Sequence, residues 1–366
     1  MRIALVGCGY AADYYLATLP NHPSLSLTGV FDSNPERQRA FTEFHGVPGY
    51  QNLPDLLGDP TVELVVNVTN PDSHVEVTEA ALLADKHVYT EKPLALHMEE
   101  ARRCIALAER RGLALGMAPC NLLGSAAQTA WRALRNGLIG RPRLVYANFD
   151  TGLFHHQSPG DWFSPSGTPW PCADELRNGI VLEHAGYKLT WLTAFFGPVK
   201  KINAFSSRVL PFDHLIGPKA PAADDFAVAC MTFEGGVAAR LNFSLAAPQD
   251  ESLLIVGDRG TLLVEYCGDF ASPVSIKLGV EPQQVQLPLL DDGVDLKCPE
   301  RFQSYDFSRG VADLADSASR GVRSHLPIDQ ALHVLELTLL IASAADGRSV
   351  CLDTSFEPVE PMPWAR

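Results

Sequence analysis

The feature that most constrains the fold is a glycine turn between an expected strand and an expected helix near the start of the chain. Residues 2–6 (RIALV) form the continuous apolar run that is typical of a buried parallel strand. Residues 7–12 (GCGYAA) follow directly and fit the pattern GxGxx(G/A). In this pattern Gly7 permits a tight turn, Gly9 lets a pyrophosphate approach the backbone, and Ala12 allows close packing of the next helix. Because the N-terminus of that helix offers free N–H groups to phosphates, the turn predicts a dinucleotide site; a glycine turn without a ligand is the alternative.

An acidic residue supports the dinucleotide interpretation and indicates which dinucleotide is bound. The next apolar run, residues 27–31, ends at Asp32, which follows Ala12 by 20 residues. A carboxylate at this place hydrogen-bonds a ribose 2′-hydroxyl and repels a 2′-phosphate. We therefore expect NAD as the cofactor, while the nearby Arg37 and Arg39 leave NADP open as an alternative.

The first third of the chain alternates apolar strand-like runs with helix-like segments. This rhythm predicts an α/β domain of the Rossmann type over residues 1–121, with a doubly wound parallel sheet covered by helices on both faces. Strand-like runs dominate after residue 121, and one long helix is expected over residues 179–196. We expect residues 122–366 to form an α+β domain with a large, mostly antiparallel open sheet. Residues 225–233 and 237–243 are expected to pair as a hairpin.

The composition restricts the classes of function. Forty-three acidic residues against 29 Lys and Arg give a net charge of −14, which disfavours nucleic acid and anionic membranes as partners. No apolar run reaches the roughly 18 residues of a membrane-spanning helix. The eight cysteines form no CxxC pair, so we expect a reduced, cytoplasmic protein without a disulfide framework. His155, His156, Cys172 and His184 could gather around an ion, but adjacent histidines rarely share one metal, and no metal is expected.

Several motifs follow one another along the chain: the glycine turn, Thr69-Asn70-Pro71 with His74, residues 86–93 (KHVYTEKP), residues 137–140 (GLIG) and residues 257–262 (GDRGTL). Their order resembles the Gfo/Idh/MocA oxidoreductases, the family of glucose–fructose oxidoreductase and inositol dehydrogenase. The resemblance covers nearly the whole chain and implies an NAD(P) domain followed by a substrate domain whose open sheet forms a homodimer or homotetramer interface. It also implies a catalytic Lys92, at the carboxyl edge of the parallel sheet.

One helix departs from the family pattern Gly-x-x-x-Asp-x-Gly-x-His-x-x-Asp, which aligns with residues 179–190. Glu183 replaces the first Asp, Tyr187 replaces the His, and Thr190 replaces the last Asp. Glucose–fructose oxidoreductase and certain sugar ketoreductases also place Tyr there, so the resemblance implies proton transfer by Tyr187. The spacing i, i+4, i+7 independently puts these three side chains on one helix face. His184 remains the alternative proton relay, and a core tyrosine is the alternative for Tyr187.

These observations predict roles for individual residues. Lys92 and Tyr187 are expected to reach the reacting oxygen, with the ammonium favouring release of the phenol proton, and Glu183 to hold a neighbouring hydroxyl or to orient Lys92. The expected catalytic residues are Lys92, Tyr187 and Glu183. The expected cofactor contacts are Gly7, Gly9, Tyr10, Ala11, Ala12, Asp32, Arg37, Thr69, Asn70, Pro71, His74, Glu91, Lys92 and Asn121. The expected substrate contacts are Trp162, Trp170, Arg177, Glu183 and Lys188.

Three functions are compatible with this set. The first is an NAD(P)-dependent dehydrogenase or ketoreductase acting on a sugar, sugar derivative or polyol. The second is an oxidative glycosidase, in which a tightly held NAD oxidises the sugar transiently before elimination. The third is a non-catalytic sensor of sugar or cofactor. The intact Glu91-Lys92-Pro93 sequence favours catalysis.

Overall fold

The computed structural model describes residues 1–212, 215, 223–280, 283–294, 296, 304–343 and 348–366. The chain divides into two compact units, each made of several segments. Unit 1 comprises residues 1–120, 159–171 and 295–332, and unit 2 comprises residues 121–158, 172–294 and 333–366. The structure thus adds two later segments to the N-terminal domain expected over residues 1–121.

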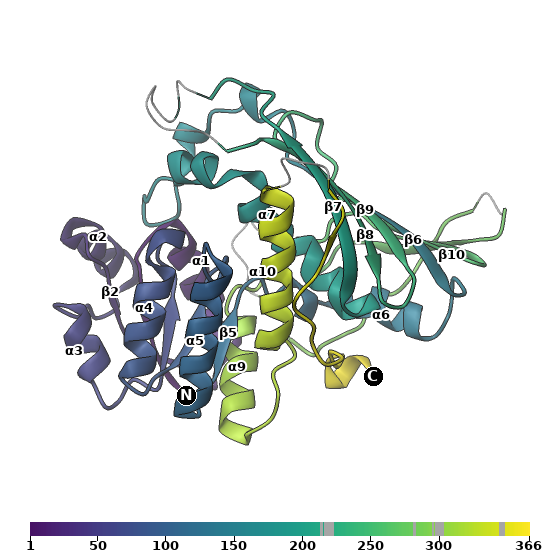
Figure 1. Cartoon of the computed structure of the whole chain (residues 1–366). Coiled ribbons are helices and arrows are strands. Elements are labelled where there is room, and N and C mark those ends of the chain that lie inside the picture. The colour runs from purple at the N-terminus through teal and green to yellow at the C-terminus, as the bar shows by residue number, and fades with distance from the viewer. Residues whose placement is uncertain (213–214, 216–222, 281–282, 295, 297–303, 344–347) are drawn as a thin grey trace. The chain divides into compact units, whose positions relative to one another are not determined.

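Unit 1 contains a five-stranded parallel sheet in the order β2-β1-β3-β4-β5, which confirms the expected Rossmann architecture (Figure 1). The strand order reverses between the adjacent strands β1 and β3, so the crevice for a ligand lies beyond the carboxyl ends of these two strands. The strands are β1 (Arg2–Val6), β2 (Ser26–Phe31), β3 (Leu64–Asn67), β4 (His87–Thr90) and β5 (Leu115–Met117). The helices are α1 (Tyr10–Thr18), η1 (Leu19–Asn21), α2 (Pro35–His45), α3 (Leu53–Gly58), α4 (Pro71–Leu83), α5 (Met98–Arg111), η4 (Pro159–Asp161) and α9 (Arg309–Arg320).

Helix α9 completes the core of unit 1, although it comes almost 200 residues after β5. Val311 and Leu314 of α9 belong to the same buried cluster as Leu5 of β1 and Tyr89 of β4. The backbone of Gly310 lies so close to Tyr89 that an added Cβ would meet the phenol oxygen at 2.1 Å. This helix was not among the elements expected from the sequence, although its buried Val311, Leu314 and Ala315 have the i, i+3, i+4 spacing of an amphipathic helix.

Unit 2 contains a nine-stranded sheet in the order β13-β12-β11-β10-β6-β9-β8-β7-β14. All adjacent strands are antiparallel except β6 and β9, so the expected mostly antiparallel sheet is confirmed. The strands are β6 (Pro142–Asp150), β7 (Val199–Ser207), β8 (Phe226–Phe233), β9 (Ala238–Ser244), β10 (Leu253–Gly257), β11 (Gly260–Val264), β12 (Val274–Leu278), β13 (Val285–Gln286) and β14 (Val350–Cys351). The helices are η2 (Asn121–Leu123), α6 (Ser125–Arg135), η3 (Phe154–His156), α7 (Cys172–Phe196) and η6 (Pro363–Ala365), and α10 (Ile328–Ala342) spans the division between the units.

The two faces of this sheet differ in burial. Along β8 the side chains of Ala227, Ala229, Met231 and Phe233 are buried, and those between them are more exposed, as expected for a sheet covered on one face. Helix α7 packs against β6, β8 and β9. It is interrupted at Gly179, whose φ of 81° is the left-handed conformation that glycine adopts readily. The expected hairpin is also present, as β8 pairs antiparallel with β9.

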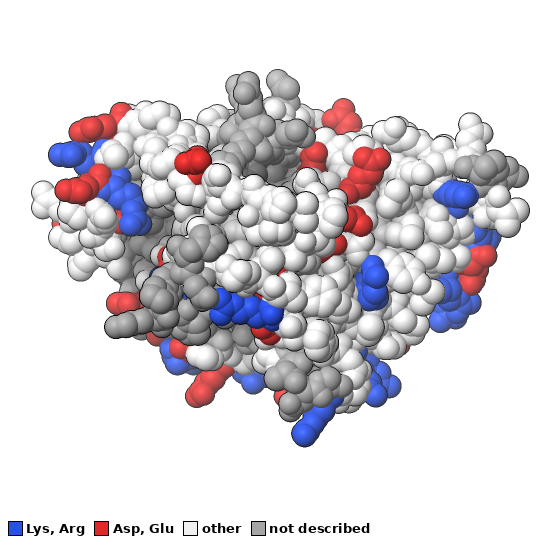
Figure 2. All heavy atoms as spheres, turned by 90° about the horizontal axis from the view of Figure 1, so that it is seen from above, with Lys and Arg blue, Asp and Glu red and all other residues white. Residues whose placement is uncertain are grey.

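Charged side chains are dispersed over the face of the molecule shown in Figure 2, where Lys, Arg, Asp and Glu are separated by wide uncharged areas. Among the described residues, no helix has both the length and the apolarity to cross a bilayer. The seven cysteines that the structure describes are free thiols, and Cys298 lies outside the described residues.

Candidate functional site

The glycine turn of unit 1 forms an open cradle at the N-terminus of α1. Gly7 has a φ of 102°, and a Cβ there would lie 2.6 Å from the carbonyl oxygen of Val68, so only glycine fits. Gly9 caps α1, and no atom lies within 4 Å of the position that its Cβ would take. Gly7, Gly9, Asp32, Arg37 and Thr69 are among the residues that line one pocket. The cradle therefore suits a phosphate group, which backbone N–H groups of α1 would bind.

Asp32 is fixed at the edge of this pocket by hydrogen bonds from the backbone. Its Oδ2 accepts the N–H of Cys8 at 2.8 Å, and its Oδ1 accepts the N–H of Asn34 at 2.7 Å. The guanidinium of Arg37 lies 3.5 Å from Oδ2. Asp32 thus ties the glycine turn to the end of β2, and its carboxylate is in place to accept a ribose hydroxyl.

Both carboxylate oxygens of Glu91 accept hydrogen bonds, one from Tyr15 and the other from the backbone of Lys92. The hydroxyl of Tyr15, itself buried in α1, donates to Oε1 of Glu91 at 2.7 Å. The N–H of Lys92 donates to Oε2 at 3.0 Å. Burial and the Glu91 carboxylate raise the pKa of Tyr15, so this phenol stays protonated and remains a donor. Glu91 therefore fixes the turn after β4, where a parallel sheet binds its ligands.

His74 lies behind the pocket. It is fully buried, with Nδ1 2.7 Å from the carbonyl oxygen of Pro93 and Nε2 2.9 Å from that of Thr69. Burial lowers the pKa of the imidazole. His74 thus links the loop after β3 to the loop after β4, whereas Thr69 and Asn70 line the pocket themselves. His74 therefore holds these two loops in position.

The two tryptophans belong to unit 1, in the segment of residues 159–171. The N–H of Trp170 donates to the carbonyl oxygen of Trp162 at 2.8 Å, and their ring centroids are 5.0 Å apart. Ser166 of the same segment donates to Oδ2 of Asp13 at 2.7 Å, and His45 lies 2.6 Å from the other oxygen of Asp13. The tryptophan segment is therefore fastened to α1, the helix that begins at the glycine turn.

In unit 2, Tyr187 is held from both its backbone and its ring. Asn121 donates through Nδ2 to the carbonyl oxygens of Tyr187 and Cys267, each at 2.9 Å. The ring of Tyr187 stacks on that of Phe149, with the two ring centroids 6.2 Å apart. The centroid of the His184 ring lies 4.7 Å from that of Phe149. Because Asn121 is fully buried, its place in the structure is to hold α7 against the segment after β11.

The remaining predicted residues of α7 differ in accessibility. Glu183 is buried, and its Oε1 accepts Nδ2 of Asn178 at 2.8 Å. Lys188 is only 1% exposed and donates to the backbone oxygen of Glu251, so its ammonium points into unit 2. Arg177 is exposed and pairs with Asp174 at 2.6 Å. Among the described residues, no group of three or more His, Cys, Asp and Glu side chains could hold a metal ion.

Two carboxylic acids that the sequence analysis did not single out lie beside Lys188. Burial raises the pKa of Glu251 to about 7 and that of Asp150 to about 6, with Asp250 adding to the effect on Asp150. Neither residue lies in a motif. The one sequence signal is an acidic residue beside an apolar strand: Asp150 ends β6, and Glu251 precedes β10 by two residues.

Comparison with protein families gives matches in both parts of the chain. Residues 1–118 match the GFO/IDH/MocA model described as an oxidoreductase family with an NAD-binding Rossmann fold. Residues 127–263 match the model of the GFO/IDH/MocA C-terminal domain.

Two curated relatives are named for sugar chemistry. The 1,5-anhydro-D-fructose reductase of Ensifer adhaerens is 33% identical over 266 residues, which cover 72% of this chain and 75% of the relative. The D-apiose dehydrogenase of Paraburkholderia graminis is 28% identical over 267 residues, which cover 71% of this chain and 66% of the relative.

Solved structures share the fold over almost the whole chain. A 3-ketoreductase from Actinomadura kijaniata, crystallised with TDP-benzene and NADP, superposes with a TM-score of 0.73 at 22% identity and covers 94% of this chain and 98% of its own. An oxidoreductase from Agrobacterium radiobacter, crystallised with NAD+, L-tartaric acid and magnesium, has a TM-score of 0.78 at 18% identity, with 96% and 98% covered.

Proposed function

Because the chain belongs to the Gfo/Idh/MocA family of NAD(P)-dependent oxidoreductases, we propose that it interconverts a hydroxyl and a ketone on a sugar, sugar derivative or polyol. The observation that carries the proposal is the double hydrogen bonding of Glu91, which fixes Lys92 at the carboxyl edge of the nucleotide-binding sheet. NAD(P) held at this site would supply or accept the hydride. The open cradle at Gly9 supports binding of its pyrophosphate.

In the proposed mechanism, Lys92 and Tyr187 both act on the reacting oxygen of the substrate. During reduction, Tyr187 gives its hydroxyl proton to the oxygen, and the Lys92 ammonium stabilises the negative charge that develops there. Oxidation runs in reverse, with Tyr187 taking the proton. Glu183, held by Asn178, accepts a hydrogen bond from a neighbouring substrate hydroxyl.

We propose a carbohydrate substrate because both relatives above are named for sugars or sugar derivatives. The paired rings of Trp162 and Trp170 suit stacking on a sugar ring, and Arg177 suits a hydroxyl or a phosphate. The free thiols among the described cysteines support a reducing, cytoplasmic location as part of this proposal.

The test is a panel assay followed through NADH or NADPH absorbance. D-apiose and polyols are offered with NAD or NADP, and 1,5-anhydro-D-fructose and 3-keto sugars with NADH or NADPH. Net formation or consumption of reduced cofactor with at least one compound is the expected result. Cleavage of a glycoside without net NADH would favour the oxidative glycosidase instead. Cofactor binding without any turnover would favour the sensor.

Replacing Asp32 by alanine is expected to shift the cofactor preference from NADH toward NADPH. The change removes the acceptor for the ribose hydroxyl and the charge that repels a 2′-phosphate, and it releases Arg37. We expect the ratio of the two dissociation constants, measured by fluorescence, to change by about 100-fold, or roughly 2.7 kcal/mol. Since loss of the bond from Cys8 weakens both cofactors, the ratio is the informative quantity. Asp32→Ala with Arg37→Ala should lose the gain in NADPH binding, and an unchanged ratio would contradict the assignment.

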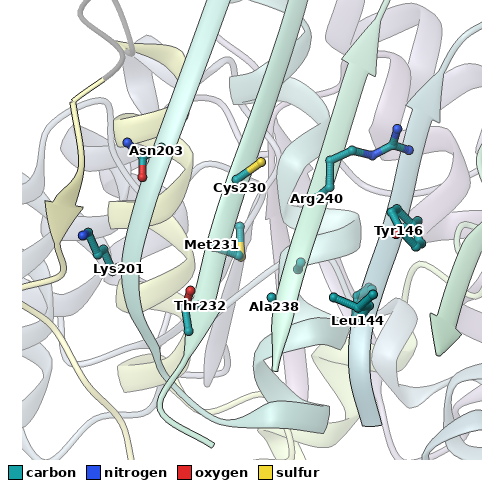
Figure 3. A pocket seen from close by; sticks show the side chains of 11 residues that line it. Leu144, Tyr146, Lys201, Asn203, Cys230, Met231, Thr232, Ala238 and Arg240 are labelled. Atoms are coloured by element: carbon teal, nitrogen blue, oxygen red, sulfur yellow. The ribbon is translucent and has the colours of Figure 1, made fainter. Parts of the chain in front are cut away.

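We also propose that the exposed face of the nine-stranded sheet joins two copies of the chain. Leu144 and Tyr146 of β6 are 41% and 39% exposed there, and Arg240 of β9 lies over the Tyr146 ring at 5.3 Å (Figure 3). Exposed apolar side chains on one sheet face are typical of a protein interface. Cys230, Thr232 and Lys201 line the same groove.

Replacing Leu144 and Tyr146 together by glutamate is expected to yield monomers, because the change buries two charges in the proposed interface. Light scattering after gel filtration measures the mass of each species. Phe44→Glu, which changes an exposed apolar residue of unit 1, is the matched control and should keep the wild-type mass. A wild-type protein that is monomeric at micromolar concentration would refute this interface.

A further inference from the structure

A short hairpin of unit 1 begins at Trp162 and ends at Trp170, and it is called the tryptophan hairpin below. The N–H of Trp170 donates to the carbonyl oxygen of Trp162 at 2.8 Å, and an antiparallel bridge joins Phe163 to Pro169. Ser166 lies at the tip, four residues from each tryptophan. The hairpin therefore carries two indoles at its base and a hydroxyl at its tip.

The tip of the tryptophan hairpin is bonded to the first turn of α1. The hydroxyl of Ser166 donates to Oδ2 of Asp13 at 2.7 Å, and Nε2 of His45, the last residue of α2, lies 2.6 Å from Oδ1. Asp13 is fully buried. Because a carboxylate only accepts hydrogen bonds, Ser166 and His45 act as its donors. A buried carboxylate that loses a donor is left with an unmet acceptor, so this contact fixes the tip of the hairpin on α1.

Asp13 also lies close to the glycine cradle. It follows Gly9, the N-cap of α1, by four residues, which is about one helical turn or 6 Å. Since side chains of a helix lean toward its N-terminus, the carboxylate of Asp13 is directed toward the end of α1 that is proposed to bind phosphate. The indoles lie no more than about 14 Å from the tip, which is the reach of four extended residues. One buried carboxylate thus attaches the tryptophan pair to the helical turn beside the cradle.

We propose that Asp13, through Ser166, positions Trp162 and Trp170 for the substrate and links their position to the presence of the cofactor. The inference rests on the proposed function, in which the two indoles stack on a sugar ring. Binding of a phosphate at the N-terminus of α1 restrains the first turn of this helix, and the bond from Ser166 extends the restraint to the tryptophan hairpin. The cofactor therefore binds first and orders the indoles that receive the sugar. Asp13 and Ser166 are positioning residues, because they act through the two indoles.

The first test is hydrogen exchange measured by mass spectrometry, and it needs no substrate. We expect NADH to slow exchange in the tryptophan hairpin on the order of tenfold in the wild type and by less than about twofold in Ser166→Ala. The N–H groups of Ser164, Gly167 and Trp170 report this change, because their hydrogen bonds lie within the hairpin. Ser158→Ala makes the same chemical change at an exposed residue before the hairpin and should respond as the wild type does. Equal protection by NADH in the wild type and Ser166→Ala would overturn the link to the cofactor.

The second test is steady-state kinetics with a compound that the wild type turns over. In Ser166→Ala we expect the KM for this compound to rise about tenfold, while kcat and the dissociation constant of NADH stay within about threefold of the wild type. The reason is that the indoles contribute to binding of the sugar and not to proton transfer. Ser166→Thr keeps the hydroxyl and should restore the KM. A lower kcat with an unchanged KM would overturn the positioning role.

A double-mutant cycle shows whether Ser166 acts through the indoles. In a background that carries Trp162→Ala and Trp170→Ala, Ser166→Ala should raise the KM no further, because no indole remains to be positioned. Additive effects on the KM would overturn the positioning role, even if the protection by NADH depends on Ser166.

The measurements separate this inference from the proposed function. A wild type that transfers no hydride to any compound of the panel would overturn the proposed function, and with it the positioning of the indoles for a sugar. Hydrogen exchange decides the link between the cofactor and the tryptophan hairpin in either case.

Discussion

Replacing Lys92 by alanine, or Tyr187 by phenylalanine, is expected to lower kcat by about 10²–10⁴-fold while NADH binding stays within a few-fold of the wild type. In the proposed mechanism, Lys92 provides the positive charge at the reacting oxygen, and Tyr187 provides the proton. The proposed cofactor contacts at Gly9 and Asp32 need neither side chain. Steady-state kinetics measures kcat and KM, and fluorescence titration measures the dissociation constant of NADH.

Control variants separate chemistry from damage to the fold. Tyr146→Phe removes the same hydroxyl from an exposed tyrosine of β6 and should keep kcat. Lys92→Arg keeps the charge but changes its geometry, so a partial recovery is expected relative to alanine. If Tyr187→Phe keeps its turnover while His184→Gln loses it, then His184 is the proton donor. Near wild-type turnover in Lys92→Ala and Tyr187→Phe together would refute the mechanism.

Gly7→Ala is expected to abolish cofactor binding and to lower the free energy of unfolding by about 3 kcal/mol. The native φ of 102° is strained for alanine, and its Cβ would lie 2.6 Å from the carbonyl oxygen of Val68. Since this contact is with backbone, no side-chain rotation relieves it. The turn must shift, and the N–H groups proposed to bind the phosphates would move with it.

Gly9→Ala provides the matched comparison in the same turn. Gly9 has a φ of −79°, and no atom lies within 4 Å of the position of its Cβ. This variant should keep the wild-type free energy of unfolding and weaken NADH binding on the order of tenfold or more, because the new methyl would fill the space proposed for the phosphate. Urea unfolding and NADH fluorescence provide the two measurements. Tight NADH binding by Gly9→Ala would show that the cofactor lies elsewhere.

Features encoded by local pattern could be predicted from the sequence. The glycine turn, the strand ending at Asp32 and the hairpin of β8 and β9 each depend on residues close together in the chain. The position of Lys92 at the carboxyl edge of the parallel sheet was expected from the family resemblance. These features are predictable because backbone conformation and side-chain alternation are decided within a few residues.

Features that depend on distant partners could not be predicted. The helix α9 and the tryptophan segment join unit 1 through contacts with Tyr89 and Asp13, far away in the sequence. His74 matched a cofactor motif, yet its ring is enclosed by two carbonyl oxygens from different loops. The environment of Glu251 is assembled from three elements, so its raised pKa has no counterpart in the sequence pattern.

The late position of α9 has a consequence for the order in which a growing chain can fold. All five strands of the Rossmann sheet have been synthesised by residue 117. The α9 side chains that pack in the same core as Tyr89 are synthesised only after residue 309. In the meantime the strands of the nine-stranded sheet from β6 to β13 emerge. The N-terminal segment of unit 1 therefore keeps part of its apolar surface exposed while most of unit 2 is synthesised. The core of unit 1 is completed only near the end of translation.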